Sequence, residues 1–178
     1  TQLVENLGGR IEGSGTIKTG SGPIDGQVEN RIGTVAPGEG VGTLHITGRY
    51  ANSVEGMLEI EIGGTTAGTE HDQLVVDGNV TLGGKLDVEL VALGGGSPFD
   101  PTTGNTFTLI SATGDLGGQF DQIQLPVGPV WDISYTGSSA ILQVISTLPG
   151  DFTGDGVVDR TDYTVWRDTL GATNRPPA

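Results

Sequence analysis

Cysteine is absent from this sequence of 178 residues, and basic residues are scarce. Without cysteine, neither a disulfide framework nor thiolate chemistry is available to the protein. Only 8 Lys and Arg stand against 22 Asp and Glu, which gives a formal net charge of -14 at pH 7. Because a surface of that sign repels phosphate backbones and anionic lipid headgroups, nucleic acids and anionic membrane surfaces are excluded as partners.

Long hydrophobic runs are missing as well. No stretch has the length and apolar character of a membrane-spanning helix or of a signal peptide, so we expect no membrane insertion. The sequence opens at Thr1 without a methionine, from which we expect a processed product or a fragment of a longer protein.

Aromatic side chains make up only 5% of the chain. Carbohydrate-binding surfaces stack exposed aromatic rings on sugar faces, and few rings are available for that here. Most of the rings fall in strand-like patterns, where packing in the core is the expected role. Tyr50 and Phe99 are the candidates for exposure, and therefore for ligand binding.

Glycine is abundant instead, with 32 residues spread along the whole chain. Across residues 11–145, short segments of alternating apolar and polar residues are separated by turns rich in Gly, Asn and Asp. In MLEIEI (57–62), for example, the leucine and isoleucines face one side while the methionine and glutamates face the other. The pattern predicts an all-β protein, either a β-solenoid or a β-sandwich, which periodicity alone does not separate.

Candidate catalytic groups are few. Glu59 and Glu61 lie on one strand face, whereas glycosidase carboxylates flank a cleft, so we interpret both as solvated charges. Glu70, His71 and Asp72 could bind a second metal, but adjacent residues point apart. We therefore expect no enzyme, with a polysaccharide lyase or a glycosidase as the remaining enzyme classes.

The most explicit chemical motif is DFTGDGVVDRTD at residues 151–162. It follows the calcium-loop pattern D-x-[DN]-x-[DN]-G with a threonine at the third position, and Gly156 stands where the loop must turn sharply. Carboxylates this close repel one another unless a cation lies between them. The predicted calcium ligands are Asp151, Thr153, Asp155, the carbonyl of Val157, Asp159 and Asp162.

The segment YTVWRDTLG (163–171) follows this loop and predicts a short helix that ends at Gly171. Loop and helix together resemble one repeat of a bacterial type I dockerin. The resemblance implies half an EF-hand with Ca²⁺ as its cofactor, and it makes Arg160 and Thr161 candidate contacts to a cohesin-like protein. One such repeat is present in this sequence.

The order of segments across residues 10–145, from GVGTLHITGRY through MLEIEIGG and GNTFTLISATG to VWDISY, resembles the C-terminal region of autotransporter-type passenger domains. The resemblance implies a right-handed parallel β-helix whose last turns are capped by irregular strands. We expect two units, the β-helix at residues 1–147 and the calcium loop, helix and C-terminal linker at residues 148–178.

Calcium loops of this type are usually filled outside the cell, where calcium is abundant, so we expect a secreted or surface-exposed protein. The predicted function is a non-catalytic, calcium-binding stalk or adhesin-like module of a larger protein. The alternative is a carbohydrate-binding module appended to a polysaccharide-degrading enzyme, with a polysaccharide or a cell-surface glycan as the partner.

Overall fold

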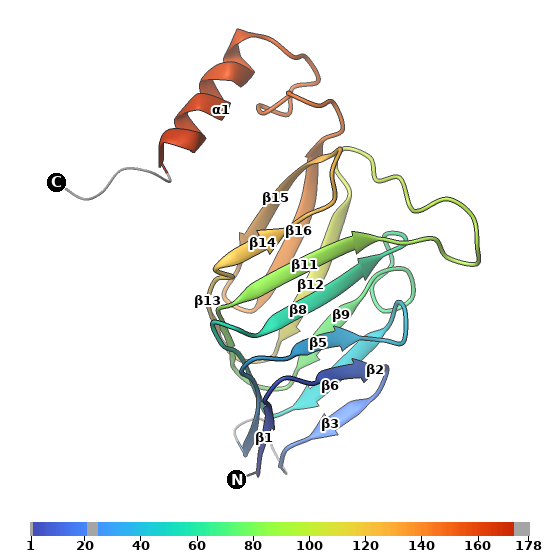
Figure 1. The fold of residues 1–178 in the computed structure, drawn as a ribbon, viewed down its shortest axis with the longest axis vertical. Coiled ribbons are helices and arrows are strands. Elements are labelled where there is room, and N and C mark those ends of the chain that lie inside the picture. Colours follow the sequence, from blue (N-terminus) through green and yellow to red (C-terminus); the bar gives the residue numbers. More distant parts are fainter. Residues whose placement is uncertain (1, 21–24, 173–178) are drawn as a thin grey trace, which may run out of the picture.

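The computed structural model describes residues 2–20 and 25–172, in which sixteen strands form three sheets and one helix follows them. Successive strands enter the three sheets in turn, and in the parallel part each strand pairs with the strand three places further along the chain (Figure 1). We call three consecutive strands, one in each sheet, a circuit; β1 to β3 form the first circuit. Circuits therefore stack on one another along the long axis.

The first sheet has the order β1-β4-β7-β10-β13 and consists of Gln2–Asn6, Gly26–Asn30, Arg49–Asn52, Val80–Leu82 and Leu116–Gly118. The second sheet has the order β2-β5-β8-β11-β14 and consists of Arg10–Gly13, Thr34–Pro37, Met57–Ile62, Lys85–Leu90 and Gln122–Gln124. The third sheet has the order β3-β6-β9-β12-β16-β15 and consists of Thr16–Lys18, Thr43–Thr47, Gln73–Val76, Thr106–Ala112, Ser139–Ser146 and Val130–Tyr135. Pairing is parallel except where β16 joins β12 and β15.

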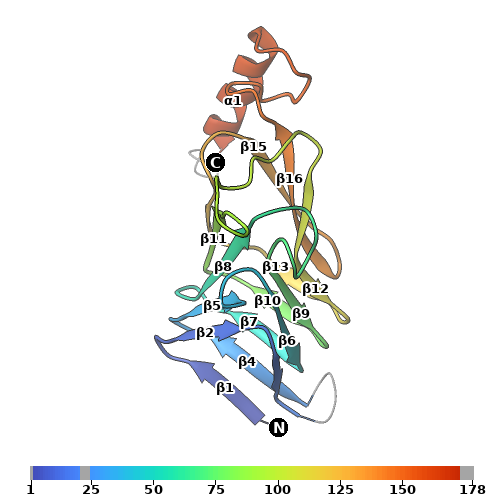
Figure 2. The same cartoon turned by 90° about the vertical axis from the view of Figure 1, so that its right-hand side faces the viewer.

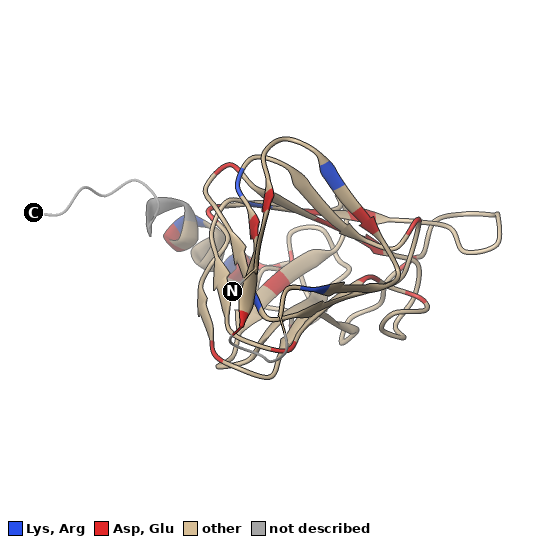
Figure 3. Cartoon of the chain, turned by 90° about the horizontal axis from the view of Figure 1, so that it is seen from below, with Lys and Arg blue, Asp and Glu red and all other residues tan. Residues whose placement is uncertain are grey.

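The core lies between the three sheets, which surround it when the molecule is seen from the β1 end (Figure 3). Strict alternation along β8 puts Leu58, Ile60 and Ile62 inside, each with 0% of its surface exposed. Leu58 lies in register between Val35 of β5 and Leu86 of β11, so aliphatic side chains stack directly from circuit to circuit. The alternation predicted for residues 57–62 is confirmed.

An asparagine stack marks the bend between the first two sheets. Asn6, Asn30 and Asn52 occupy the same register position in β1, β4 and β7, and all three are buried. Asn6 Nδ2 donates to Asn30 Oδ1 over 3.0 Å, and Asn30 Nδ2 donates to Asn52 Oδ1 over 2.8 Å. Asn30 Nδ2 also donates to the carbonyl of Met57 at 3.0 Å, which ties the first sheet to the second. Because buried amides need partners, this stack fixes where the chain bends.

The predicted fold needs correction. The described residues form three separate sheets of mostly parallel strands, and no closed solenoid, so the prediction of a right-handed parallel β-helix is wrong in that form. The alternative, a β-sandwich, is wrong as well, because a sandwich requires two facing antiparallel sheets. Periodicity identifies the buried face of each strand, but pairing partners and strand direction depend on how the connections run.

The C-terminal segment leaves β16 and ends in α1 (Arg160–Ala172), beyond the end of the sheets (Figure 2). The predicted start of this helix at residue 163 is three residues too late, and the helix extends one residue past Gly171. The predicted linker at residues 174–178 lies outside the described residues. Within the described part of the chain, no helix has the length and apolar character needed to cross a membrane.

Candidate metal centre

The loop at residues 151–162 connects β16 to α1, and glycines turn its backbone sharply. Gly154 and Gly156 have φ values of 75° and 83°, a conformation that costs an ordinary residue about 1–2 kcal/mol. A β-carbon on Gly154 would lie 3.0 Å from the carbonyl oxygen of Ile145 in β16, so the loop packs directly on that strand. The turn expected at Gly156 is present.

Asp151 is the centre of the first half of the loop and is 1% exposed. Its Oδ1 accepts the N–H of Gly154 at 2.8 Å, and its Oδ2 accepts the N–H of Gly156 and the hydroxyl of Ser146, each at 2.8 Å. Burial alone would raise the pKa of Asp151, but these hydrogen bonds outweigh it, so the pKa lies below its usual value. The contact to Ser146 anchors the loop to β16.

Asp162 is the corresponding buried carboxylate in the second half of the loop, with 2% of its surface exposed. Its Oδ2 accepts the N–H of Asp159 at 2.7 Å, while Asp159 Oδ1 accepts the N–H of Thr161 at 2.7 Å. Asp159 therefore acts as the N-cap of α1, and Asp162 in the first turn reaches back to the N–H of this N-cap residue, which explains why the helix begins at Arg160. The bond from the Asp159 N–H is the main reason why the pKa of Asp162 lies below its usual value.

The two buried carboxylates meet at Thr153. Thr153 Oγ1 lies 3.3 Å from Asp151 Oδ1 and 3.0 Å from Asp162 Oδ1. Three of the predicted ligands are therefore neighbours, although they lie up to eleven positions apart in the sequence. The sequence pattern for a calcium loop names these residues, but the capping role of Asp162 is also visible in its spacing of three from Asp159.

The remaining predicted ligands lie on the outside of the loop. Asp155 and Asp159 are exposed, and Asp155 Oδ1 accepts the N–H of Val157 at 2.9 Å. Val157 itself is 56% exposed. Within residues 2–20 and 25–172, no three or more His, Asp or Glu side chains are grouped closely enough to hold a metal ion. The donor set is nevertheless chemically suited to calcium, because it consists entirely of hard oxygen atoms.

The other predicted contact residues differ in how far they are exposed. Tyr50 is only 1% exposed and its hydroxyl donates to Asn52 Oδ1 at 3.1 Å, so the prediction that its ring is exposed is wrong. Burial raises the pKa of Tyr50, and the side chain belongs to the core because its strand position points inward. Phe99 is half-buried, with its ring centroid 6.3 Å from that of Phe107. Arg160 and Thr161 are exposed in the first turn of α1.

An apolar groove lies next to the predicted ligands. It has a volume of about 200 Å³ and is lined by Phe152, Val158, Tyr163 and Trp166 together with Asp159 and Asp162. Trp166 is 41% exposed, and its ring centroid lies 5.7 Å from that of Tyr163. A change in the loop is therefore expected to alter the surroundings of this tryptophan.

The structure also shows a buried carboxylate, Asp72, whose role the sequence pattern did not indicate. Asp72 is 1% exposed; its Oδ1 accepts the N–H of Gly42 at 2.7 Å and its Oδ2 accepts the N–H of Glu61 at 2.8 Å. Burial is the main cause that raises the pKa of Asp72 to about 7. The neighbouring His71 is also buried, where Phe107 contacts its ring at 5.3 Å between centroids and desolvation lowers its pKa.

A second groove crosses the outer face of the second sheet. It has a volume of about 200 Å³ and is lined by Met57, Lys85, Asp87, Gln122, Ile123 and Gln124. The in-register pairs Lys85–Gln122 and Asp87–Gln124 place hydrogen-bonding side chains side by side on β11 and β14. Such a row of polar groups can bind a polar ligand that lies flat on the sheet.

No family model matches this chain. Over 87 residues the sequence is 40% identical to the Adhesin BmaC autotransporter of Brucella suis biovar 1 (strain 1330). The matched part is 47% of this chain and 2% of that adhesin, so the chain spans a small fraction of the relative's length. The match partly supports the predicted resemblance to an autotransporter passenger region, and it gives no support to the dockerin-like repeat.

Proposed function

We propose that this chain is a non-catalytic, adhesin-like or stalk module of a larger secreted or surface protein, and that its C-terminal loop binds calcium. The identity with the Brucella adhesin supports the type of module and its location outside the cell. Because the match covers 2% of that adhesin, the proposal concerns the type of module and its location, and does not extend to the activity or partners of the whole adhesin.

The observation that carries the calcium proposal is the meeting of two buried carboxylates at one hydroxyl. Asp151 and Asp162 are 1% and 2% exposed, and both contact Thr153 Oγ1. Two like charges so close together in a poorly hydrated place favour a cation between them. Calcium takes about six to eight oxygen ligands, and the residues that would supply them are Asp151, Thr153, Asp155, Val157, Asp159 and Asp162.

Calcium in this loop would have a structural role. Asp151 is attached to β16 through Ser146, and Asp162 lies in the first turn of α1. A positive charge held by both carboxylates would join the end of the third sheet to the helix. The loop would then stabilise the C-terminal end of the module in the calcium-rich medium outside the cell.

Isothermal titration calorimetry of the full chain with CaCl₂ tests this proposal. We expect one site, whose affinity falls at least about tenfold in Asp155→Asn, because this exposed residue contributes charge without supporting the core. Asp168→Asn, a change of the same chemistry on the exposed helix surface, serves as the control and keeps the affinity. Equal affinities in all three proteins, or no heat of binding, would remove calcium from the proposal.

A polysaccharide is the second candidate ligand, and the groove on the second sheet favours it. Adjacent Lys, Asp and Gln side chains can donate to and accept from sugar hydroxyls, while Met57 offers an apolar contact. Retention on a panel of soluble and insoluble polysaccharides tests it, with the double variant Gln122→Ala and Gln124→Ala against the control Gln2→Ala. Saturable retention lost in the double variant supports glycan binding at this groove; no retention of the parent chain rejects it.

A further inference from the structure

The end of the molecule formed by the first circuit exposes three sheet edges together. Within residues 2–20 and 25–172, β1, β2 and β3 are each the last strand of their sheet, with a strand paired on one side only. Figure 1 shows these strands at the lower end of the stack. An edge strand leaves a row of backbone N–H and C=O groups without strand partners, which is a template for the addition of another strand.

Three columns of stacked aliphatic side chains, one in each sheet, end at the first circuit. Val4, Ile11 and Ile17 are half-buried, whereas their register partners one circuit further on, Val28, Val35 and Ile46, are each 0% exposed. The same kind of residue therefore occupies the same column, and the half-buried member of each column has a described aliphatic neighbour on one side only. One more layer of aliphatic side chains would remove the remaining apolar surface from water.

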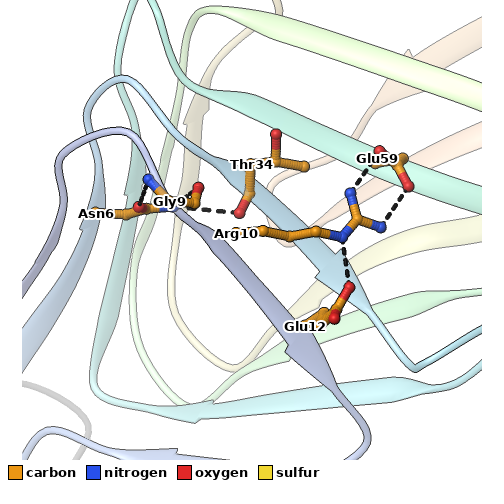
Figure 4. Close-up of polar contacts among 6 residues, drawn as sticks. All are labelled: Asn6, Gly9, Arg10, Glu12, Thr34 and Glu59. Atoms are coloured by element: carbon orange, nitrogen blue, oxygen red, sulfur yellow. Dashed lines mark hydrogen bonds and ion pairs between the residues drawn. The ribbon is translucent and has the colours of Figure 1, made fainter.

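The asparagine stack also ends in the first circuit, at Asn6. Asn30 Oδ1 accepts from Asn6 Nδ2, and Asn52 Oδ1 accepts from Asn30 Nδ2. Asn6 Oδ1 accepts the N–H of Gly9 at 2.9 Å, and in the described residues it has no asparagine donor. Figure 4 shows Asn6 beside Gly9 and Thr34, near the ion pairs of Arg10. A carbonyl oxygen has two acceptor positions, so one more amide donor fits the pattern of the stack.

The opposite end of the stack is built differently. β13 and β14 have only three residues each, and β15 and β16 pair antiparallel beyond β12. Phe120 is 7% exposed there, and Tyr135 and Trp131 pack against the core. The backbone N–H of Phe120 donates to the hydroxyl of Tyr135 over 3.4 Å. Aromatic residues and antiparallel strands therefore cover this end, and a second copy of the chain offers no parallel circuit there.

We propose that the edges of β1, β2 and β3 are a docking surface for one further three-strand circuit of polypeptide, joined to the N-terminal side of β1 and running parallel to it. This circuit places aliphatic side chains over Val4, Ile11 and Ile17 and an asparagine over Asn6. Its route follows the connection from β6 to β7, where the single residue Gly48 leads from the third sheet into the first. The proposal is independent of calcium, which concerns the other end.

The chain itself supplies the probe for this surface. A copy of residues 26–48 is fused directly to Leu3, so that the copied Gly48 takes the place of Gln2. Register is kept, because Leu3 and Arg49 both align with Gln27 of β4. The copied Val28, Val35 and Ile46 then lie over Val4, Ile11 and Ile17, and the copied Asn30 lies over Asn6. The control extension has the same length and carries V28S, V35S and I46S in the copy only.

Hydrogen–deuterium exchange of the backbone amides in β1 to β3 is the readout, together with the thermal midpoint. We expect the extension to slow exchange in these strands at least about tenfold and to raise the midpoint by several degrees, while the serine control does neither. An extension with N30A in the copy should give a smaller gain. Exchange that is equally slow with and without the extension would overturn the proposal.

Sedimentation velocity of the unextended chain tests whether a second copy of the chain, instead of a further circuit, occupies this surface. If two copies meet by their open ends, the chain dimerises as its concentration rises, and the extension abolishes the dimer. That outcome would replace the proposed circuit by a second copy. A monomer at all concentrations, with protection gained only in the extended chain, is the expected result.

Discussion

The guanidinium of Arg10 in β2 reaches past β5 to the carboxylate of Glu59 in β8, 49 positions later in the chain, with N–O distances of 2.6 Å and 2.8 Å (Figure 4). Arg10 also contacts Glu12 of its own strand. The hydrogen bond from Arg10 is the main reason why the pKa of Glu59 lies below its usual value. One cation thus links two strands of the second sheet, β2 and β8, across the β5 strand that lies between them.

Replacing Glu59 by glutamine should have a small effect on folding. The ion pair lies at the surface, so we expect the free energy of unfolding to fall by about 0.5–1 kcal/mol, and less at high salt. The loss should disappear as the pH falls through the pKa of Glu59, since the carboxylate is then neutral in the parent as well. Urea unfolding at two salt concentrations measures it, with the exposed Glu55→Gln as the control; a loss of several kcal/mol would contradict this description.

Replacing Asn30 by alanine should be far more costly. Asn30 is 0% exposed, and its side chain bonds to Asn6, Asn52 and the carbonyl of Met57. Its removal leaves buried groups without partners, for which we expect a loss of about 3 kcal/mol in the free energy of unfolding. The exposed Gln143→Ala on β16 should change it by less than about 0.5 kcal/mol. Similar losses in both variants would show that the stack is not a stabilising element.

Asp72 should make the protein less stable as the pH rises toward neutrality. Its pKa of about 7 in the folded state is above the unfolded value of about 3.9. Below that unfolded value Asp72 is protonated in both states, and its contribution to the free energy of unfolding is at its maximum. Between these two pKa values only the unfolded state releases the proton, so stability falls by up to about 4 kcal/mol and then levels off above pH 7.

The difference between the parent and Asp72→Asn isolates this effect from the other carboxylates. We expect the free energy of unfolding of the variant to lack the decline between about pH 4 and pH 7, because the amide does not titrate. Urea unfolding at intervals across that range measures both proteins. Parallel curves would show that Asp72 is already ionised in the folded state under acidic conditions.

A β-carbon at Gly156 should weaken calcium binding through the backbone. Gly156 has a φ of 83°, and no atom lies within 4 Å of an added β-carbon, so Gly156→Ala introduces conformational strain without a steric clash. We expect a loss of about 1 kcal/mol, equivalent to a roughly fivefold weaker affinity, because the bound loop needs this turn. Gly137→Ala has the same open surroundings without positive φ and should leave the affinity unchanged. Titration followed by tryptophan fluorescence measures both, and equal affinities would contradict the turn's role.

Several local features could be predicted from the residues alone. The inward face of β8, the turn at Gly156 and the oxygen-rich loop depend on neighbours within a few positions, so a period of two or a short motif is enough to find them. The predicted helix start at residue 163 is too late because Asp159 and Asp162, which fit the calcium pattern, also cap the helix. The predicted exposure of Tyr50 is wrong because its position in β7 points the ring into the core.

By itself, the sequence determined that the protein is acidic, free of cysteine and built from short β-strands with one buried face, since composition and alternation are local properties. Only the tertiary structure decided that the strands form three sheets, that Asn6, Asn30 and Asn52 stack, and that Asp72 is buried beside Glu61. These relationships join residues in different strands, some of them in successive circuits. They depend on the path of the connections, which no short-range pattern encodes.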